Sequence, residues 1–288
     1  MLILGIDTSG RQGSVALVRA VGVEPGAEAP ALQPGTRQML PLRPQALAGT
    51  RQMLPLRPQA LAELSGGQYS ELLVSTIARL LEEQGLKRSE IGLIGVASGP
   101  GSFTGLRIAI ATVKGLAEAF ATPVVDVTVL EALAQSLGGG SQKGTRQQTP
   151  LRPLALAQSL SGKVIAVLDA QRSEVFFGEY VLGEGIAGYP VRMIREALAD
   201  FSGFTAVLAA GDASSEIITP DEAIAERLRA VGVEAKLVGR PSAEVYARIA
   251  YTKFCAGIRA DVATLDANYL RRSDAEIFPV SKSGIAPA

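Results

Sequence analysis

Two glycine-bearing turns near the start of the chain hold residue types that could bind a ligand. The first, Asp7-Thr8-Ser9-Gly10, follows an apolar run. A carboxylate at a strand end, followed by hydroxyls and a glycine, can hold a hydrated cation and approach nucleotide phosphates closely. The same residues also form ordinary turns that bond to the local backbone. Asp7 and Thr8 are therefore candidate cofactor-binding residues, with a plain turn as the alternative.

The second turn has the sequence SGPGSFTGLR, from Ser98 to Arg107. Its glycines permit tight backbone geometry, and the first N–H groups of a following helix would suit an anion. It is not a P-loop, because the pattern GxxxxGK[ST] is missing. The alternative is a structural strand-to-helix turn with Ser102 or Thr104 as the N-cap. As a phosphate site, its candidate residues are Gly99, Gly101 and Ser102.

The composition narrows the chemistry further. The chain has no histidine, which excludes Ser-His-Asp and Cys-His nucleophile systems, imidazole bases and His-containing metal sites. A carboxylate-only metal site or carboxylate-driven phosphoryl transfer stays open. We predict no catalytic residue, no metal site and no cofactor, apart from weak nucleotide binding at a shared interface.

Charge, cysteine content and hydropathy indicate the class of protein. The 28 basic residues balance the 28 acidic ones, which argues against a dominant nucleic-acid surface. A single cysteine, Cys255, excludes an internal disulfide framework. No apolar run reaches the roughly 18 residues of a membrane span, and the N-terminus lacks a secretory pattern. We therefore expect a cytoplasmic protein without membrane contact.

The elements that must position the two turns follow from the apolar pattern. Each half of the chain begins with an antiparallel strand meander and continues with helices and strands, as expected for a two-lobed α/β fold with mixed sheets flanked by helices. We predict an N-terminal lobe over 1–137, a linker over 138–161 and a C-terminal lobe over 162–288. The strands are expected at 2–7, 14–20, 60–64, 91–98, 123–127, 164–170, 173–181 and 205–212, and the helices at 69–81, 104–120, 130–137, 221–231 and 242–257.

Two further polar turns belong to the second half. The stretch from Asp169 to Glu174 separates two expected strands, as an ordinary charged hairpin turn would. Asp212 ends another expected strand, where a nucleotide-binding protein of this class could contact the nucleoside. The plain turn is the favoured interpretation of both.

A repeated segment interrupts this pattern. GTRQMLPLRPQALA occupies 35–48 and again 49–62, and a degenerate copy fills 144–157. We interpret the copies as insertions into surface loops, because extending a loop costs little free energy. The alternative is a basic, proline-rich arm for an acidic partner: the copies hold six arginines and no acidic residue. The rest of the chain is acidic, so we expect tRNA to be contacted only indirectly.

The expected helix over 104–120 is apolar around much of its circumference and has a row of small residues at four-residue spacing. A helix that is apolar on more than one face needs a second partner besides its own sheet. The alternative is burial entirely within its own lobe. The predicted partner interface comprises Ile108, Ala111, Gly115 and Ala119 of this helix, with Leu73, Ile77 and Leu80 of the helix over 69–81.

Taken together, these segments resemble the TsaB (YeaZ-like) family. The opening MLILGIDTSG with GSVALV, the signature GPGSFTGLR, the segment VIAVLDAQRSEVFFGEY and the ending NYLRRSD occur in the family's order. The resemblance covers essentially the whole chain except the repeats. It implies an actin-like/Hsp70-like (ASKHA, RNase H-like) fold with degenerate nucleotide machinery. The family's catalytic paralogue, TsaD, holds metal through a histidine pair, which this chain lacks.

The resemblance also implies a function and partners. Members support TsaD in threonylcarbamoyl transfer to the adenosine beside the anticodon of ANN-decoding tRNAs. An ATPase, TsaE, joins them, and TsaC makes the adenylate substrate. The N-terminal-lobe helices pair with those of TsaD or of a second TsaB copy. We therefore expect an accessory subunit, without catalytic activity, that forms a heterodimer with a TsaD-like protein or a homodimer.

Three other functions remain as alternatives. An ATP-dependent phosphotransferase of the same fold would use Asp7 for the cation and the second turn for phosphates, although no carboxylate base is identifiable. A protease is disfavoured because histidine and metal-ligand clusters are missing. Direct RNA binding through the arginine repeats would show strong salt dependence.

Overall fold

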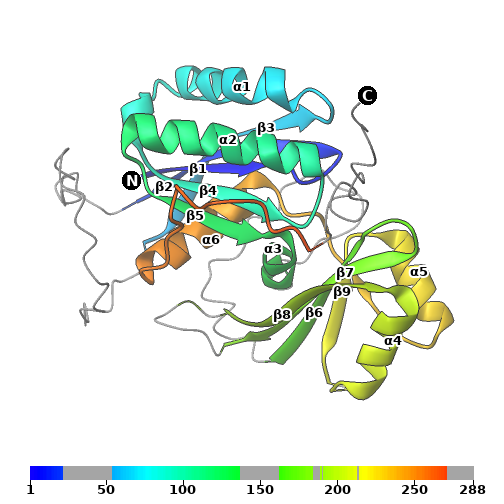
Figure 1. Ribbon diagram of the computed structural model, residues 1–288. Coiled ribbons are helices and arrows are strands. Elements are labelled where there is room, and N and C mark those ends of the chain that lie inside the picture. Colours follow the sequence, from blue (N-terminus) through cyan, green and yellow to red (C-terminus); the bar gives the residue numbers. More distant parts are fainter. Residues whose placement is uncertain (22–53, 137–161, 184–188, 190, 213, 271–288) are drawn as a thin grey trace, which may run out of the picture.

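A computed structural model describes residues 1–21, 54–136, 162–183, 189, 191–212 and 214–270. Two five-stranded mixed sheets form its framework (Figure 1). The first has the order β3-β2-β1-β4-β5 and the second β10-β9-β6-β7-β8. The strands of the first sheet are β1 (Leu2–Asp7), β2 (Gln12–Ala20), β3 (Leu56–Ser65), β4 (Ile91–Gly99) and β5 (Val124–Thr128).

The first sheet begins as an antiparallel meander and continues with parallel strands. β1 pairs antiparallel with β2, and β2 with β3, whereas β4 lies parallel to β1 and β5 parallel to β4. Both faces of β1 are buried: Leu2, Leu4 and Ile6 face one core and Ile3 the other. This burial on both faces explains why β1 is a continuous apolar run rather than an alternating one.

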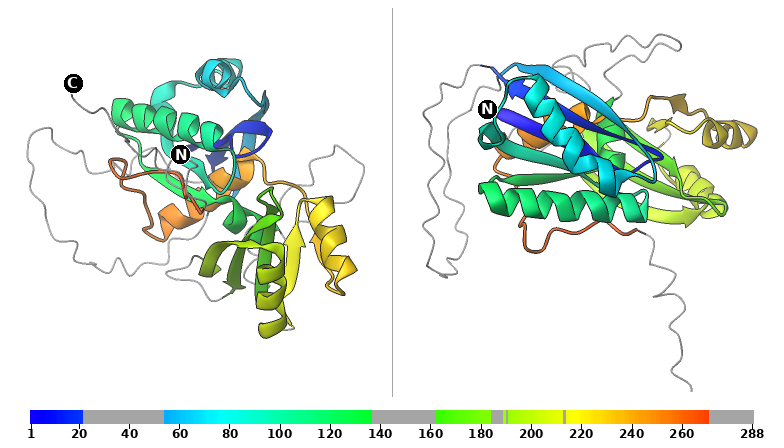
Figure 2. Two further views of the ribbon diagram at one scale, coloured as in Figure 1. Left: turned by 45° about the vertical axis from the view of Figure 1, so that its right-hand side comes forward. Right: turned by 90° about the horizontal axis from the view of Figure 1, so that it is seen from above.

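Helices cover both faces of the first sheet. α1 (Tyr69–Glu83) and α2 (Phe103–Phe120) lie together on one face, as seen from above in Figure 2. α6 (Ala243–Cys255) and α3 (Val129–Gln135) lie on the other face, where they share one core with the second sheet. α6 comes from the range that we predicted to be the C-terminal lobe, yet it packs on β1, β2 and β4. The boundary at 162 therefore does not separate the packing units.

The second sheet is covered on its far side by two helices. Its strands are β6 (Gly162–Asp169), β7 (Glu174–Leu182), β8 (Val191–Asp200), β9 (Glu216–Thr219) and β10 (Lys236–Leu237). α4 (Phe201–Ala210) and α5 (Glu222–Ala230) contribute Phe204, Ile224 and Leu228 to a core with β6 and β7. A 3-10 turn, η1 (Arg88–Glu90), precedes β4.

Two parts of the sequence prediction are wrong in the second half. The run that we expected to be a strand over 205–212 belongs mainly to α4, and β8 precedes it where no strand was predicted. A short apolar run fits a buried helix as well as a strand. The deciding residue is Asp200, whose carboxylate accepts a hydrogen bond from the Gly203 N–H at 2.6 Å and caps α4. Asp212 consequently follows a helix rather than a strand.

The repeated segment also differs from the prediction. β3 begins at Leu56, so the second half of the second copy is a strand that pairs with β2 and not a loop insertion. β3 lies at the edge of the sheet, where a proline is tolerated, and Pro58 lies at a register shift in the pairing with β2. Ala62 and Leu64 of this strand are buried. The first and third copies lie outside the described residues.

This arrangement predicts the effect of deleting one repeat. Removing 35–48 leaves the same sequence as removing 49–62, so the shortened chain keeps a copy of LRPQALA to form β3. We expect the free energy of unfolding to change by about 0.6 kcal/mol or less, because loop length has a weak effect on stability. Urea denaturation measures it. Removing 35–62 is the control and should destabilise the chain strongly, since β3 and its contacts with α1 are lost. Equal stability of the two deletions would contradict the assignment of β3.

Candidate functional site

The two glycine-bearing turns of the first lobe lie against each other. The Ser102 N–H donates to the Ser9 carbonyl at 2.7 Å, and the Thr8 hydroxyl donates to the Gly105 carbonyl at 2.7 Å. A side chain at Gly101 would lie 2.3 Å from the Ser9 carbonyl oxygen, which only glycine avoids. Hydrogen bonds and sterics thus hold the end of β1 and the start of α2 as one unit.

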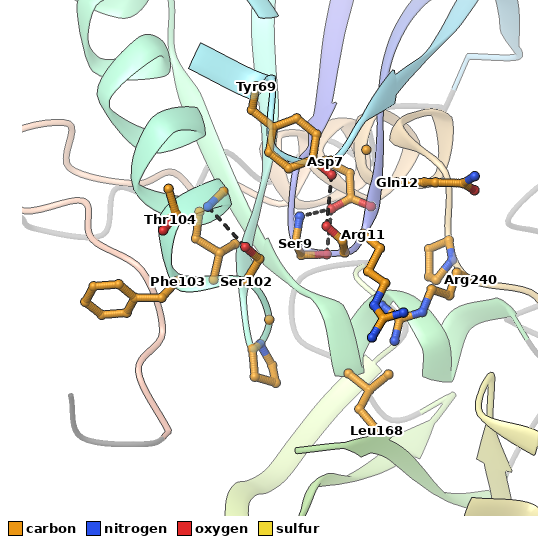
Figure 3. A pocket seen from close by; sticks show the side chains of 18 of the residues that line it. Asp7, Ser9, Arg11, Gln12, Tyr69, Ser102, Phe103, Thr104, Leu168 and Arg240 are labelled. Atoms are coloured by element: carbon orange, nitrogen blue, oxygen red, sulfur yellow. Dashed lines mark hydrogen bonds between the residues drawn. The ribbon is translucent and has the colours of Figure 1, made fainter. Parts of the chain in front are cut away.

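Asp7 is the buried acid of this unit. Its Oδ1 atom accepts the Ser9 N–H at 2.9 Å and the Ser9 hydroxyl at 2.6 Å (Figure 3). Burial raises the pKa of the Asp7 carboxyl above its usual range, while the Ser9 hydrogen bonds and the Arg240 charge lower it in part. This carboxylate is therefore held in one orientation by its own turn, with burial opposing its ionisation.

A cleft of about 1730 Å³ opens beside Asp7 between the two sheets. It is lined by both glycine-bearing turns, by the β6–β7 turn and by the segment that precedes α6. Arg240 enters from that segment, and its guanidinium lies 3.4 Å from the Asp221 carboxylate. In Figure 3 the side chains of Arg11 and Arg240 come from different directions and their ends converge on the side where Leu168 lies. The cleft is lined by both acidic and basic residues, so it has no single sign of charge.

The candidate binding residues take different positions in this geometry. Asp7, Gly101 and Ser102 line the cleft. Thr8 is fully buried and its hydroxyl is bonded to Gly105, which agrees with the plain-turn alternative. Gly99 has a φ of +114° and packs against the Asn268 carbonyl, so it too serves the local fold. Ser102 is the N-cap of α2, as expected, accepting the Gly105 N–H at 3.3 Å.

The predicted interface residues divide into two groups. Leu73, Ile77 and Leu80 of α1 are buried in the core of the first lobe, at 1%, 5% and 3% exposure, so they do not offer a surface to a partner. The apolar stripe of α1 packs on its own sheet and on α2, so this part of the predicted interface is wrong. On α2, in contrast, Ala111, Gly115 and Ala119 are exposed and Ile108 is half-buried. An added Cβ at Gly115 would meet no atom within 4 Å.

The β6–β7 turn and the segment before α6 also line the cleft. The sequence favours a plain turn for the first and singles out no residue of the second. Gln171, Arg172 and Ser173 all have positive φ, between 51° and 64°, and Gln171 and Arg172 line the cleft. Arg240 and Asp221 also line it. No spacing rule connects Arg240 with Asp7, because α6 brings them together only through tertiary packing. The one local signal is the Arg240-Pro241 pair directly before a helix start.

In the part of the chain that the structure describes, no three His, Cys, Asp or Glu side chains lie close enough together to hold a metal ion. None of the helices in the same ranges is long and apolar enough to cross a membrane.

Curated relatives cover less than half of the chain. The chain is 28% identical to the tRNA threonylcarbamoyladenosine biosynthesis protein TsaB of Escherichia coli over 118 residues. These residues make up 41% of this chain and 43% of that protein. Over 133 residues the chain is 27% identical to the Bacillus subtilis protein of the same description, 46% of this chain and 49% of that one. The matched region thus spans less than half the length of these relatives.

Solved structures match over a greater length. A Pseudomonas aeruginosa structure, described as an uncharacterized protein with similarity to peptidase YEAZ, has a TM-score of 0.60 and 25% identity, covering 94% of this chain and 99% of that one. YeaZ from the same species has a TM-score of 0.59 and 23% identity over 93% of this chain. Together with the two mixed sheets, these neighbours show an actin-like/RNase H-like α/β fold.

The family model described as TsaD, tRNA N6-adenosine threonylcarbamoyltransferase, matches residues 62–262. The chain belongs to this family, as a TsaB/YeaZ-like member. The match begins inside β3 and ends after α6, so it includes the second glycine-bearing turn and the whole second sheet. The residues of α6 that return to the first sheet are thus part of the matched family region.

The site predicts an unusual pH response for Asp7→Asn. Folding raises the pKa of the Asp7 carboxyl above its unfolded-state value. The contribution of this group to the free energy of unfolding is therefore fully present below the unfolded-state pKa. It is lost as the pH rises through the folded-state pKa. Asparagine keeps an acceptor for both Ser9 donors and cannot ionise. We expect the variant to be at least as stable as the wild type at pH 7, with the difference shrinking toward pH 4, in urea denaturation over that range.

Asp212→Asn is the matched control with the opposite sign. The Ser214 N–H and hydroxyl, followed by Lys163, lower the pKa of the exposed Asp212 carboxyl to about 2. Its contribution is therefore present at neutral pH and lost as pH falls through the folded-state pKa. A loss of stability at pH 7 in Asp7→Asn would contradict the assignment, since it would mean that the ionised carboxylate is stabilised in the fold.

Proposed function

We propose that this chain is a non-catalytic accessory subunit in tRNA threonylcarbamoyladenosine biosynthesis. It binds a TsaD-like catalytic subunit and supports threonylcarbamoyl transfer to the adenosine next to the anticodon of ANN-decoding tRNAs. The names of the TsaB relatives support the pathway. In this proposal a TsaE-like ATPase joins the complex, tRNA is contacted only indirectly, and a homodimer can form through the same surface as the heterodimer.

The exposed face of α2 is the observation that carries the proposal. Its row Ala111, Gly115 and Ala119 is exposed, and the space above Gly115 is open. Small residues at four-residue spacing let a second helix approach the backbone closely, and so increase packing contacts. On the opposite side of α2, Leu106, Ile110 and Val113 already fill its own lobe. α2 therefore has one face packed in the core of its own lobe and a second, exposed face of small residues.

The active-site chemistry expected of a transferase has less support. The chain contains no histidine, and Asp7, one of the acids that line the cleft, is bonded within its own turn. Burial opposes the ionisation that cation binding would require. An ATP-dependent phosphotransferase is the second candidate, because Asp7, Gly101 and Ser102 share one cleft. Measuring ATP turnover by the isolated chain distinguishes the phosphotransferase from the accessory subunit.

The decisive experiment reconstitutes tRNA modification with TsaC, TsaD and TsaE from the same organism. We expect threonylcarbamoyladenosine to form on tRNA only when this chain is added, whereas the chain alone hydrolyses no ATP. Mass spectrometry of digested tRNA measures the first and phosphate release the second. Modification that proceeds equally without the chain contradicts the accessory role. ATP hydrolysis, or phosphoryl transfer from ATP to a sugar with release of ADP, by the isolated chain supports the phosphotransferase instead.

Gly115→Leu tests the α2 face. The added side chain meets no atom of its own lobe, and leucine is the better helix former by roughly 0.8 kcal/mol. We therefore expect the variant to fold with equal or higher stability but to lose tenfold or more in affinity for the TsaD-like protein, because the close approach of a second helix is blocked. Val74→Leu, at an exposed position of α1, is the control and should bind as the wild type does. Unchanged affinity of Gly115→Leu would place the interface elsewhere.

A further inference from the structure

An exposed cluster of Phe103, Arg107 and Tyr269, which we call the Arg107 clamp, lies where α2 begins. The Arg107 guanidinium lies 3.7 Å from the centroid of the Phe103 ring and 5.8 Å from that of Tyr269. Its Nε donates to the Tyr269 hydroxyl at 3.0 Å. The two rings are 5.0 Å apart and retain 38% and 36% exposure. A cation stacked on aromatic rings in this way is held in place without being removed from the surface.

The clamp is built from two distant segments of the chain. Phe103 and Arg107 are four residues apart on α2 and so share one face of the helix. Tyr269 belongs to residues 258–270, which we call the C-terminal strap. The strap is fixed to the first lobe by the Ala260 N–H, which donates to the Val124 carbonyl at 2.9 Å, and by the buried Leu265. These contacts orient the tyrosine before any partner arrives.

The second sheet also holds the strap, directly next to Tyr269. The Asn268 N–H donates to the Ser98 carbonyl at 2.7 Å, and the Asn268 side-chain amide donates to the Glu196 carboxylate of β8 at 2.7 Å. Thr128 and Tyr180 donate hydroxyl hydrogen bonds to the same carboxylate. Asn268 is therefore anchored by both lobes, and it positions the residue that orients Arg107.

The guanidinium still has binding capacity. Within the described residues, Tyr269 is the acceptor for its Nε, and its two terminal nitrogens have no acceptor. A guanidinium with a fixed plane and unused parallel donors fits a carboxylate in a two-hydrogen-bond, side-by-side arrangement. Much of the entropy cost of ordering a long arginine side chain has already been met in the fold, which favours affinity. This geometry suits a fixed binding contact rather than a solvated surface charge.

The clamp continues the exposed row of α2. Positions 103, 107, 111, 115 and 119 follow one another at four-residue spacing, so Arg107 precedes Ala111 and Gly115 on the same ridge. A helix that packed on the small residues would place its own side chains over the clamp. Arginine and aromatic residues are the types that contribute most at protein interfaces. A nucleic acid fits less well: along this row the small residues are neutral, and the nearby Lys114 amine is bonded to the Ala263 carbonyl.

We propose that Arg107 is the charged anchor of the α2 surface and that it receives an Asp or Glu carboxylate from the protein partner that docks there. The inference rests on the proposed function, because it takes the TsaD-like subunit as that partner. Tyr269 acts as a positioning residue, which sets the plane of the guanidinium. The strap thus adds to the partner surface a polar contact that α2 alone could not orient.

Calorimetry of the full chain with the TsaD protein of the same organism tests the anchor. We expect Arg107→Gln to weaken binding tenfold to a hundredfold, and Arg107→Lys to remain at least fivefold weak because lysine lacks the planar fork. Tyr269→Phe should weaken binding by a few fold only. Arg79→Gln is the matched control: Arg79 is exposed on α1 and pairs with Glu83 at 2.8 Å, so its loss should change affinity less than twofold. Circular dichroism and urea midpoints confirm that each variant folds.

The outcomes separate this inference from the proposed function. If the wild-type chain binds and Arg107→Gln binds within twofold of it, the anchor is overturned while the accessory role stands. If the wild-type chain shows no binding, the docking role fails and the anchor fails with it. If Arg107→Gln instead weakens tRNA binding by the isolated chain, in a gel-shift assay, and leaves binding to the TsaD protein unchanged, the clamp is an RNA contact and the inference is wrong. If salt weakens binding of the wild-type chain to the TsaD protein but does not weaken binding of Arg107→Gln, the anchor is supported.

Discussion

The close approach of α6 to the first sheet is the contact on which the rest of the structure depends. At Gly5 an added Cβ would lie 2.0 Å from the Ala243 carbonyl oxygen, and at Gly95 it would lie 2.8 Å from that of Tyr246. The helix backbone therefore rests directly on β1 and β4, at a distance that only glycine permits. The contact returns the chain from the second lobe to the first. It places Arg240 next to Asp7 and starts the strap that ends at the clamp.

The lobes are also joined by two carboxylates, the buried Glu131 and the partly buried Glu196. Glu131 of α3 accepts hydrogen bonds from the Tyr189 hydroxyl and from the Lys253 amine, the latter at 2.9 Å, so it links the segment before β8 to α6. Glu196 of β8 collects donors from β5, β7 and the strap, and burial raises the pKa of its carboxyl. Buried charges are tolerated only where hydrogen bonds compensate them. Such contacts connect the two lobes through polar side chains.

The cleft and the outer face of α2 present different kinds of side chain. At the cleft, Asp7 accepts hydrogen bonds from Ser9, and Arg240 donates to the Asp221 carboxylate. Along α2, in contrast, small residues and a stacked arginine face outward.

The amino-acid sequence by itself determined the identity of most elements and the row of small residues on α2, because these depend on local spacing and on side-chain type. The structure decided that Ser102, rather than Thr104, is the N-cap and that the row is exposed. The family resemblance rested on the same short-range information. Only the tertiary structure decided that Leu73, Ile77 and Leu80 face their own core, that Thr8 is a structural residue and that α6 belongs to the first sheet. Each of these outcomes depends on which surfaces pack together, and the periodicity of one segment does not show which other segment packs on it. The helix α4 and the strand β3 show the same limit, since a short apolar run or a repeated segment adopts the conformation that its packing partner stabilises.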